Sequence, residues 1–390
     1  MMENGISTDD YLALCEYVGL TPAITVRFQQ GLPGPGGDVE EAQQWVEYLN
    51  GEVSTPYGAL RAARGHPEPY NVTYWYLGNE ISQQKRYPSY PRVVNGDPPP
   101  HTEEYKQMLL NIVEPMIKAS TSGPLRLLTV SGGTAWDKAW AAAVGDHVFA
   151  TSFHDGYMNQ PRTFTQSAVT ACAKRPRGDF MGAVAALRKT LDSTGKIIAI
   201  SADEWGLGPP WRTHVFAVAH GMYAAGFLGA ITRGARANNL QMTNYFEPVN
   251  EGAVQVHPFN SSLTPVGLVM QLFSHHTAGI LLQDPANMSA ADGDLDVTAT
   301  IATNGSSLVV TVANLNAVGW MAYDLALELH GWQGTKAGTL ETLEAEGYSE
   351  LSMFKRWSGG SAALVKTAGG VPSVMLHVPP FSVVQATFAV

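Results

Sequence analysis

The sequence predicts an α/β fold in two parts, a (β/α)-type barrel at residues 1–282 and an antiparallel β-sandwich at residues 283–390. Up to about residue 280, short apolar runs alternate with segments of helical periodicity, and this spacing is typical of βα units that build a parallel sheet. After about residue 283, the chain changes to β-type runs separated by turn residues, which indicates antiparallel strands. The length of 390 residues also exceeds what one hydrophobic core usually holds.

The barrel part contains strand-like runs with helices between them. The first helix is expected to begin at a capping box that starts with Ser7 and to end at Gly19. Apolar residues from Tyr105 to Ile117 recur at helical spacing over several turns. The strand-like runs, in chain order, are 21–26, 72–77, 125–130, 148–153, 197–200 and 240–245.

The sandwich part opens with a predicted hairpin. Residues 295–301 and 308–312 are rich in β-branched side chains, and Asn304-Gly305 between them predicts a type I′ turn. The runs 374–378 and 383–390 continue the β pattern to the end of the chain.

Composition and charge exclude several classes of protein. The formal net charge of −10 argues against binding to nucleic acid, and no apolar run reaches the ~18 residues of a membrane span. Two cysteines cannot form a disulfide framework or a cysteine-based zinc site. Because the start MMENGISTDD has no basic n-region and no apolar h-region, we expect a cytoplasmic protein, or a secreted one if further residues precede Met1.

Two glutamates follow apolar strand-like runs directly. The run that begins at Tyr74 leads into Asn79-Glu80, and the run that begins at Ile197 leads into Asp203-Glu204. The reactive residues of a (β/α) barrel lie at the carboxyl ends of its strands. Retaining glycosidases need an acid/base and an ionised nucleophile about 5 Å apart, which two glutamates on different strands can supply. The alternative is that each glutamate caps the helix that follows its strand.

Several segments resemble glycoside hydrolase family 51, whose characterised members are mostly α-L-arabinofuranosidases. Residues 65–80 are similar to the region of the family's fourth strand, and residues 200–205 are similar to its nucleophile strand. Other similar segments are 9–26, 40–51, 221–244, 265–276 and 379–382. The resemblance implies a (β/α)8 TIM barrel with a C-terminal β-sandwich, and a retaining enzyme of arabinose metabolism that uses no metal or cofactor. It also implies that Glu80 is the acid/base, that Glu204 is the nucleophile and that Asn79 binds the sugar 2-OH.

Four further residues are expected at the sugar site on the same grounds. His154 matches a family histidine near the nucleophile, and Tyr157 takes the place of an aromatic residue that follows it in the family. Gln241 matches a family glutamine at the end of the last barrel strand. Trp205 adjoins the nucleophile, and we expect it to pack beside the site rather than to stack on the sugar.

The chain also departs from the family pattern. It opens shortly before the helix that precedes the family's third strand, so we expect the first two barrel strands to be missing. Since those strands supply sugar-binding residues in the family, weak hydrolysis by this chain alone is expected, and open sheet edges favour self-association. The substrate implied is an arabinose-containing oligosaccharide or polysaccharide. Two alternatives remain, namely another retaining glycosidase (an endoglucanase or xylosidase) and a non-catalytic carbohydrate-binding remnant of the family.

Overall fold

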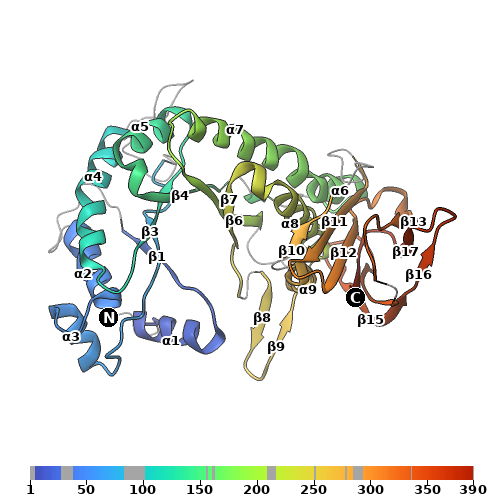
Figure 1. Cartoon of the computed structure of the whole chain (residues 1–390), viewed down its shortest axis with the longest axis horizontal. Helices are drawn as coiled ribbons and strands as arrows, with labels where there is room; N and C mark the ends of the chain where they lie inside the picture. Colours follow the sequence, from blue (N-terminus) through green and yellow to red (C-terminus); the bar gives the residue numbers. More distant parts are fainter. Residues whose placement is uncertain are drawn as a thin grey trace. The chain divides into compact units, whose positions relative to one another are not determined.

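The computed structural model divides the chain into two compact units (Figure 1). The first unit comprises residues 1–153 and 186–201, and the second comprises residues 154–185 and 202–390. The predicted fold class, a parallel βα sheet followed by an antiparallel sandwich, is confirmed. The structure describes residues 5–27, 38–82, 102–154, 157–159, 163–208, 217–249, 252–276, 279–283, 293–334 and 336–389.

A parallel sheet forms the centre of the first unit. Its strands follow the chain order, and the first residues of β6 (Ala199–Gly208) extend it beyond β4. The strands β1 to β4 lie within runs predicted from the sequence, whereas β6 continues to Gly208, well past the predicted run 197–200. Since all neighbours are parallel, their carboxyl ends lie along the same edge. The other strands are β1 (Ala23–Val26), β2 (Tyr74–Leu77), β3 (Arg126–Val130) and β4 (Val148–Ser152).

The helices of the first unit pack beside one another, with α4 between α2 and α5 and with α3 on α2. The predicted capping box at Ser7 is confirmed, with Asp10 as its partner, and Gly19 ends the helix in a left-handed conformation. The helix α4 buries Tyr105, Leu109 and four further residues of its apolar face. The helices are α1 (Thr8–Val18), α2 (Asp38–Asn50), α3 (Pro56–Ala63), α4 (Thr102–Ala119), α5 (Thr134–Val144) with the 3₁₀ turn η2 (Gly145–His147), and the second half of α7 (Met181–Asp192).

The second unit begins with the remaining barrel elements. Here β6 pairs with β5 (Tyr157–Asn159) and with β7 (Leu240–Tyr245). The helix α8 (Val218–Asn238) is buried over most of its length and packs beside β7 and α9. The other elements are α6 (Gln166–Arg175), the π-helical turn η3 (Pro176–Phe180), the hairpin β8 (Val254–His257) and β9 (Asn260–Leu263), α9 (Pro265–Phe273) and the 3₁₀ turn η4 (Ser274–His276).

The sandwich consists of a six-stranded and a three-stranded antiparallel sheet around a core that includes Val312, Leu376 and Phe388. Its first strand lies just before residue 283, where the sequence places the start of this domain. The strands are β10 (Gly279–Leu281), β11 (Leu295–Ala302), β12 (Ser307–Asn314), β13 (Tyr323–Glu328), β14 (Gly338–Ala345), β15 (Phe354–Ala362), β16 (Leu364–Lys366), β17 (Pro372–Val378) and β18 (Ser382–Ala389), with the 3₁₀ turn η5 (Val318–Trp320).

The predicted hairpin between β11 and β12 is present, but its turn differs from the prediction. A type I′ turn needs positive φ at both central residues, and here Gly305 has φ +71° whereas Asn304 does not lie in that region. The amide of Gly305 instead donates to the carbonyl oxygen of Ala302 at 2.8 Å. The type I′ prediction is therefore wrong, because the turn closes between Ala302 and Gly305, so that Thr303 and Asn304 are its central residues and Gly305 follows them in the left-handed region.

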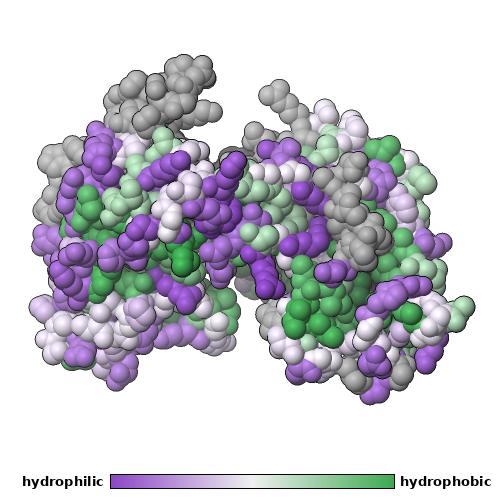
Figure 2. Space-filling model, turned by 45° about the horizontal axis from the view of Figure 1, so that its top comes forward, coloured by the Kyte–Doolittle hydropathy of each residue, from purple (hydrophilic) through white to green (hydrophobic). Residues whose placement is uncertain are grey.

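Hydrophilic side chains cover much of the surface seen in Figure 2, and apolar patches interrupt them. Scattered apolar residues are normal on a folded surface. Across the described parts of the chain, no helix is both long and apolar enough to cross a membrane.

Candidate active site

Glu204 lies between the two stretches of β6 that pair with β4 and with β5. The pairing of β6 with β4 ends at Ser201, and its pairing with β5 begins at Gly206. The side chain of Asp203 is 6% exposed, and that of Glu204 is 22% exposed. Two neighbouring carboxyl groups are thus held near the interior of the second unit, and Glu204 keeps access to a ligand.

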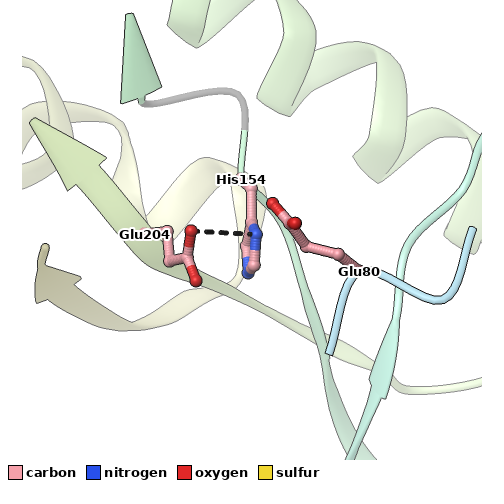
Figure 3. A group of neighbouring side chains, drawn as sticks. All are labelled: Glu80, His154 and Glu204. Atoms are coloured by element: carbon pink, nitrogen blue, oxygen red, sulfur yellow. Dashed lines mark ion pairs between the residues drawn. The ribbon is translucent and has the colours of Figure 1, made fainter. Parts of the chain in front are cut away.

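His154 lies against both of these carboxyl groups. Its Nδ1 atom is 3.4 Å from Oε2 of Glu204, the contact drawn in Figure 3, and its Nε2 atom is 3.4 Å from Oδ1 of Asp203. The imidazole side chain is 12% exposed. His154 comes directly after Phe153, whose amide extends the β4 pairing by donating to Ser201. The strand pairing therefore places His154 at the level where β6 presents its two acids.

This arrangement has a consequence for the charge of His154. An ionised carboxylate only accepts hydrogen bonds, so a ring nitrogen that faces one interacts favourably only when it carries hydrogen. Both ring nitrogens of His154 face carboxylate oxygens, and the geometry therefore favours the imidazolium form. A positive charge beside Glu204 in turn favours the ionised form of that carboxyl group.

Trp205 supports the backbone next to Glu204. It is 1% exposed, its ring stacks on Phe227 at a centroid distance of 4.2 Å, and the ring of Tyr245 meets it edge-on at 4.9 Å. Its carbonyl oxygen accepts a hydrogen bond from Phe246 at 3.0 Å. The indole is therefore placed to hold this part of β6 in position, and it presents no face to a ligand.

Glu80 lies in a tight turn that follows β2 in the first unit. Gly78 has φ +90° and Glu80 has φ +49°, a region that non-glycine residues rarely occupy. Asn79 is exposed and Glu80 is half-buried. Backbone strain of this kind concentrates at functional sites, where the surrounding structure holds it in place. The glutamate, which Figure 3 also draws, is therefore fixed by the turn rather than carried on a flexible loop.

Two further residues predicted at the sugar site, Gln241 and Tyr157, lie on β7 and β5. Gln241 is the second residue of β7, is exposed, and donates a hydrogen bond to Asn239 at 2.9 Å. The expectation that it closes the last strand is wrong, because β7 continues to Tyr245. The backbone of Tyr157 lies in β5, while its side chain is outside the described part of the structure.

Asp203 is a site residue that the sequence analysis missed. It stands beside Glu204 in the sequence, and a second acid at the end of a buried strand was the available signal. Its contact with His154 depends on how β4 and β6 pair, and the sequence alone does not show that pairing.

Comparison with known proteins relates this chain to arabinofuranosidases. Residues 1–160 match the model of the "Alpha-L-arabinofuranosidase 1 domain". Among curated relatives, a probable α-L-arabinofuranosidase C of Aspergillus niger is 44% identical over 77 residues, and α-L-arabinofuranosidase C of Emericella nidulans is 41% identical over 78 residues. Each match covers 20% of this chain and 14% of the relative.

Solved structures share the fold over nearly the whole chain. The α-L-arabinofuranosidase of Thermotoga maritima, solved as an arabinose complex, has a TM-score of 0.76 at 19% identity and covers 98% of this chain and 79% of its own. The family 51 enzyme of Thermotoga petrophila has a TM-score of 0.74 at 21% identity, with 98% and 78% coverage. A family 44 xyloglucanase of Paenibacillus polymyxa has a TM-score of 0.59 at 12% identity, with 98% and 83% coverage.

Proposed function

Because these matches support the assignment of the chain to glycoside hydrolase family 51, we propose that it is a retaining glycoside hydrolase that releases α-L-arabinofuranosyl residues. In this proposal Glu204 is the nucleophile and Glu80 is the acid/base. The observation that carries it is the setting of Glu204, a partly exposed carboxylate on β6 beside the imidazole of His154.

The direction of the strands supports a shared site for the two glutamates. The strands β2, β3, β4 and the first residues of β6 are successive parallel neighbours. Glu80 follows the last residue of β2 by three positions, and Glu204 follows Ser201 by the same number. Parallel strands end along one edge of their sheet, and a (β/α) barrel carries its active-site residues at that edge, so in this proposal both glutamates act there.

The chemistry then proceeds in two steps. The ionised carboxylate of Glu204 attacks the anomeric carbon, while the carboxyl group of Glu80 gives its proton to the departing oxygen. Glu80, now ionised, removes a proton from water, and that water displaces Glu204 from the sugar with overall retention of configuration. His154 would keep Glu204 ionised for the first step, and Asn79 would bind the sugar 2-OH.

The proposed substrate is a neutral arabinose-containing oligosaccharide or polysaccharide. The curated relatives are named α-L-arabinofuranosidases, and the Thermotoga maritima structure holds arabinose. A net charge of −10 would repel polyanions and has little effect on an uncharged sugar chain.

A panel of 4-nitrophenyl glycosides tests the proposal on the full chain. We expect release of 4-nitrophenol from the α-L-arabinofuranoside, and ¹H NMR of the first sugar formed should show the α anomer. Preferential release from the β-D-xyloside or β-D-glucoside would replace the substrate assignment with another retaining glycosidase. Inverted product would exclude the retaining mechanism, and no turnover of any glycoside would favour a non-catalytic carbohydrate-binding protein.

A further inference from the structure

The turn that carries Glu80 is held at both of its ends, at one by Tyr105 of α4, which also binds β3, and at the other by the turn after β3. The hydroxyl of Tyr105 donates to the carbonyl oxygen of Leu77 at 3.1 Å and accepts from the amide of Val130 at 3.1 Å. At the other end, Oγ of Ser82 donates to the carbonyl oxygen of Ser131 at 2.7 Å. We call residues 77–82 the Glu80 arch. Its first residue, Leu77, and its last, Ser82, are hydrogen-bonded to neighbouring segments, and Glu80 lies between them.

The arch also packs directly on Gly132. A Cβ atom placed on Gly132 would lie 2.4 Å from Cβ of Ser82 and 2.8 Å from the ring of Trp136. There is therefore no room for a side chain on residue 132 between the turn after β3 and the arch. A displacement of the backbone at Gly132 would therefore be transmitted to the arch without a flexible side chain to absorb it.

Asp137, in the first turn of α5, holds the turn after β3 in place. Its side chain is buried, and its Oδ1 atom accepts from the amide of Gly132 and from Nε1 of Trp140, each at 3.2 Å. Its Oδ2 atom accepts from Oγ of Ser131 at 3.1 Å. Burial raises the pKa of the Asp137 carboxyl group to about 6, and the hydrogen bonds from Gly132, Trp140 and Ser131 oppose that rise. Two of the three donors belong to the residues on which the arch rests.

We propose that Asp137 is a positioning residue for Glu80, acting through Ser131, Gly132 and Ser82. The inference rests on the proposed function, in which Glu80 must reach the departing oxygen of the substrate. A misplacement of about 1 Å in a catalytic group can lower a rate about a hundredfold. The buried carboxylate of Asp137 holds Ser131 and Gly132, which contact the arch. It can therefore influence the rate of proton transfer by Glu80 without contacting the sugar.

The first test uses the variant Asp137→Asn with two substrates that differ in their need for an acid. Asparagine replaces the charged carboxylate with a neutral amide that carries one acceptor and one NH₂ donor, so the hydrogen bonds from Ser131, Gly132 and Trp140 are weakened or must be rearranged. We expect kcat for benzyl α-L-arabinofuranoside, a poor leaving group, to fall roughly tenfold to a hundredfold. With 4-nitrophenyl α-L-arabinofuranoside, which needs little protonation, kcat should change less than about threefold. An equal fall with both substrates, or no fall with either, would overturn the proposal.

The matched control is Asp192→Asn. Asp192 is an exposed aspartate of the same unit that pairs with Arg188 at 2.8 Å, and its side chain is 66% exposed. Exposed pairs of this kind contribute little to stability, so both rates should stay at the wild-type level. The variant Ser82→Ala should reproduce the leaving-group effect, and combining it with Asp137→Asn should add little, since both changes act on one chain of contacts. Fully additive effects would show that Asp137 does not act through Ser82.

A second readout separates this inference from the proposed function. Hydrogen–deuterium exchange of peptides that cover residues 77–82 should be faster in Asp137→Asn than in wild type or Asp192→Asn, and this does not depend on turnover. If the wild type hydrolyses no glycoside, the proposed function fails, and the exchange rates alone decide whether Asp137 holds the arch. Unchanged exchange in Asp137→Asn would overturn the positioning role.

Discussion

The Nδ1 atom of His154 lies 3.4 Å from Oε2 of Glu204, and the opposite nitrogen of the same ring lies 3.4 Å from Asp203. A protonated histidine between two carboxylates carries one positive charge at a fixed position. Its proximity to the proposed nucleophile links the charge of the imidazole to the ionisation of Glu204.

Replacing His154 with glutamine should therefore lower kcat. Hydrogen bonds that involve a charged group contribute about 1.5–3 kcal/mol, which corresponds to roughly tenfold to a hundredfold in rate. Asp203→Asn should have a smaller effect in the same direction, because Asp203 acts on Glu204 through His154. The double variant should be no slower than His154→Gln alone, and steady-state kinetics at pH 7 measures all three.

The charge state of His154 can be observed directly. Nitrogen-15 NMR of the imidazole at pH 7 should show hydrogen on both ring nitrogens, and Asp203→Asn should weaken this signature. A neutral ring with one bare nitrogen in the wild type would contradict the imidazolium assignment.

A third prediction separates the roles of the two glutamates. Glu204→Ala should abolish turnover of every glycoside, whereas Glu80→Ala should lower the rate about 10²- to 10⁴-fold with poor leaving groups and far less with good ones. Azide should restore product formation in both variants, with inverted configuration for Glu204→Ala and retained configuration for Glu80→Ala. The products can be assigned by ¹H NMR, and the same configuration in both would refute the assignment of roles.

Much of the fold could be predicted from local pattern. The strands β2, β3 and β4 begin and end within apolar runs, and α1 follows its capping box. Such features depend on neighbours in the sequence, so they are visible without the structure. The turn after β11 was mispredicted because Asn304-Gly305 fits more than one loop length, and strand pairing decides between them.

Only part of the candidate site could be predicted, because some of its contacts join residues that are far apart in the sequence. Glu80 and Glu204 stand out because acids rarely follow buried strands without a use. Gln241 was expected at the end of the last strand because of the family resemblance, whereas the predicted run 240–245 has the bounds of β7 and makes Gln241 its second residue. Asp203 and Asp137 matter through contacts with His154 and Ser131, and such contacts appear only once the chain is folded.

A fourth prediction concerns the link between α8 and the sandwich. Asp296 is 2% exposed and forms two contacts with Arg233, at 2.7 Å and 2.5 Å. Asp296→Asn should lower the free energy of unfolding by about 3–5 kcal/mol, because it removes the buried carboxylate that faces the half-buried guanidinium of Arg233 and the buried guanidinium of Arg177, 3.9 Å away. Asp324→Asn is the matched control, since Asp324 pairs with His377 on the surface and its side chain is 75% exposed. Urea unfolding monitored by tryptophan fluorescence should show a change below about 1 kcal/mol for this control, and equal changes in both variants would contradict the prediction.

The last prediction is a loss of stability in mild acid caused by His276. This side chain is 8% exposed, and its ring nitrogens each lie 2.8 Å from a threonine hydroxyl, on Thr300 and Thr311. Burial, with a smaller effect from His275, lowers the pKa of His276 from 6.5 to about 4. The unfolded chain therefore takes up a proton at a higher pH than the folded chain does, so the stabilising effect is complete above pH 6.5 and is lost as the pH falls toward 4.

Between pH 7.5 and pH 5 this linkage should lower the free energy of unfolding by roughly 2 kcal/mol. The variant His276→Gln carries no titrating group at this position, so it should be less stable at pH 7.5 but should lose less stability on acidification than the wild type does. His330→Gln is the control, since His330 pairs with Glu328 on the surface of the sandwich and its side chain is 69% exposed. Urea unfolding of the three proteins at both pH values measures the difference. The same loss in His276→Gln as in wild type would show that other groups cause the acid sensitivity.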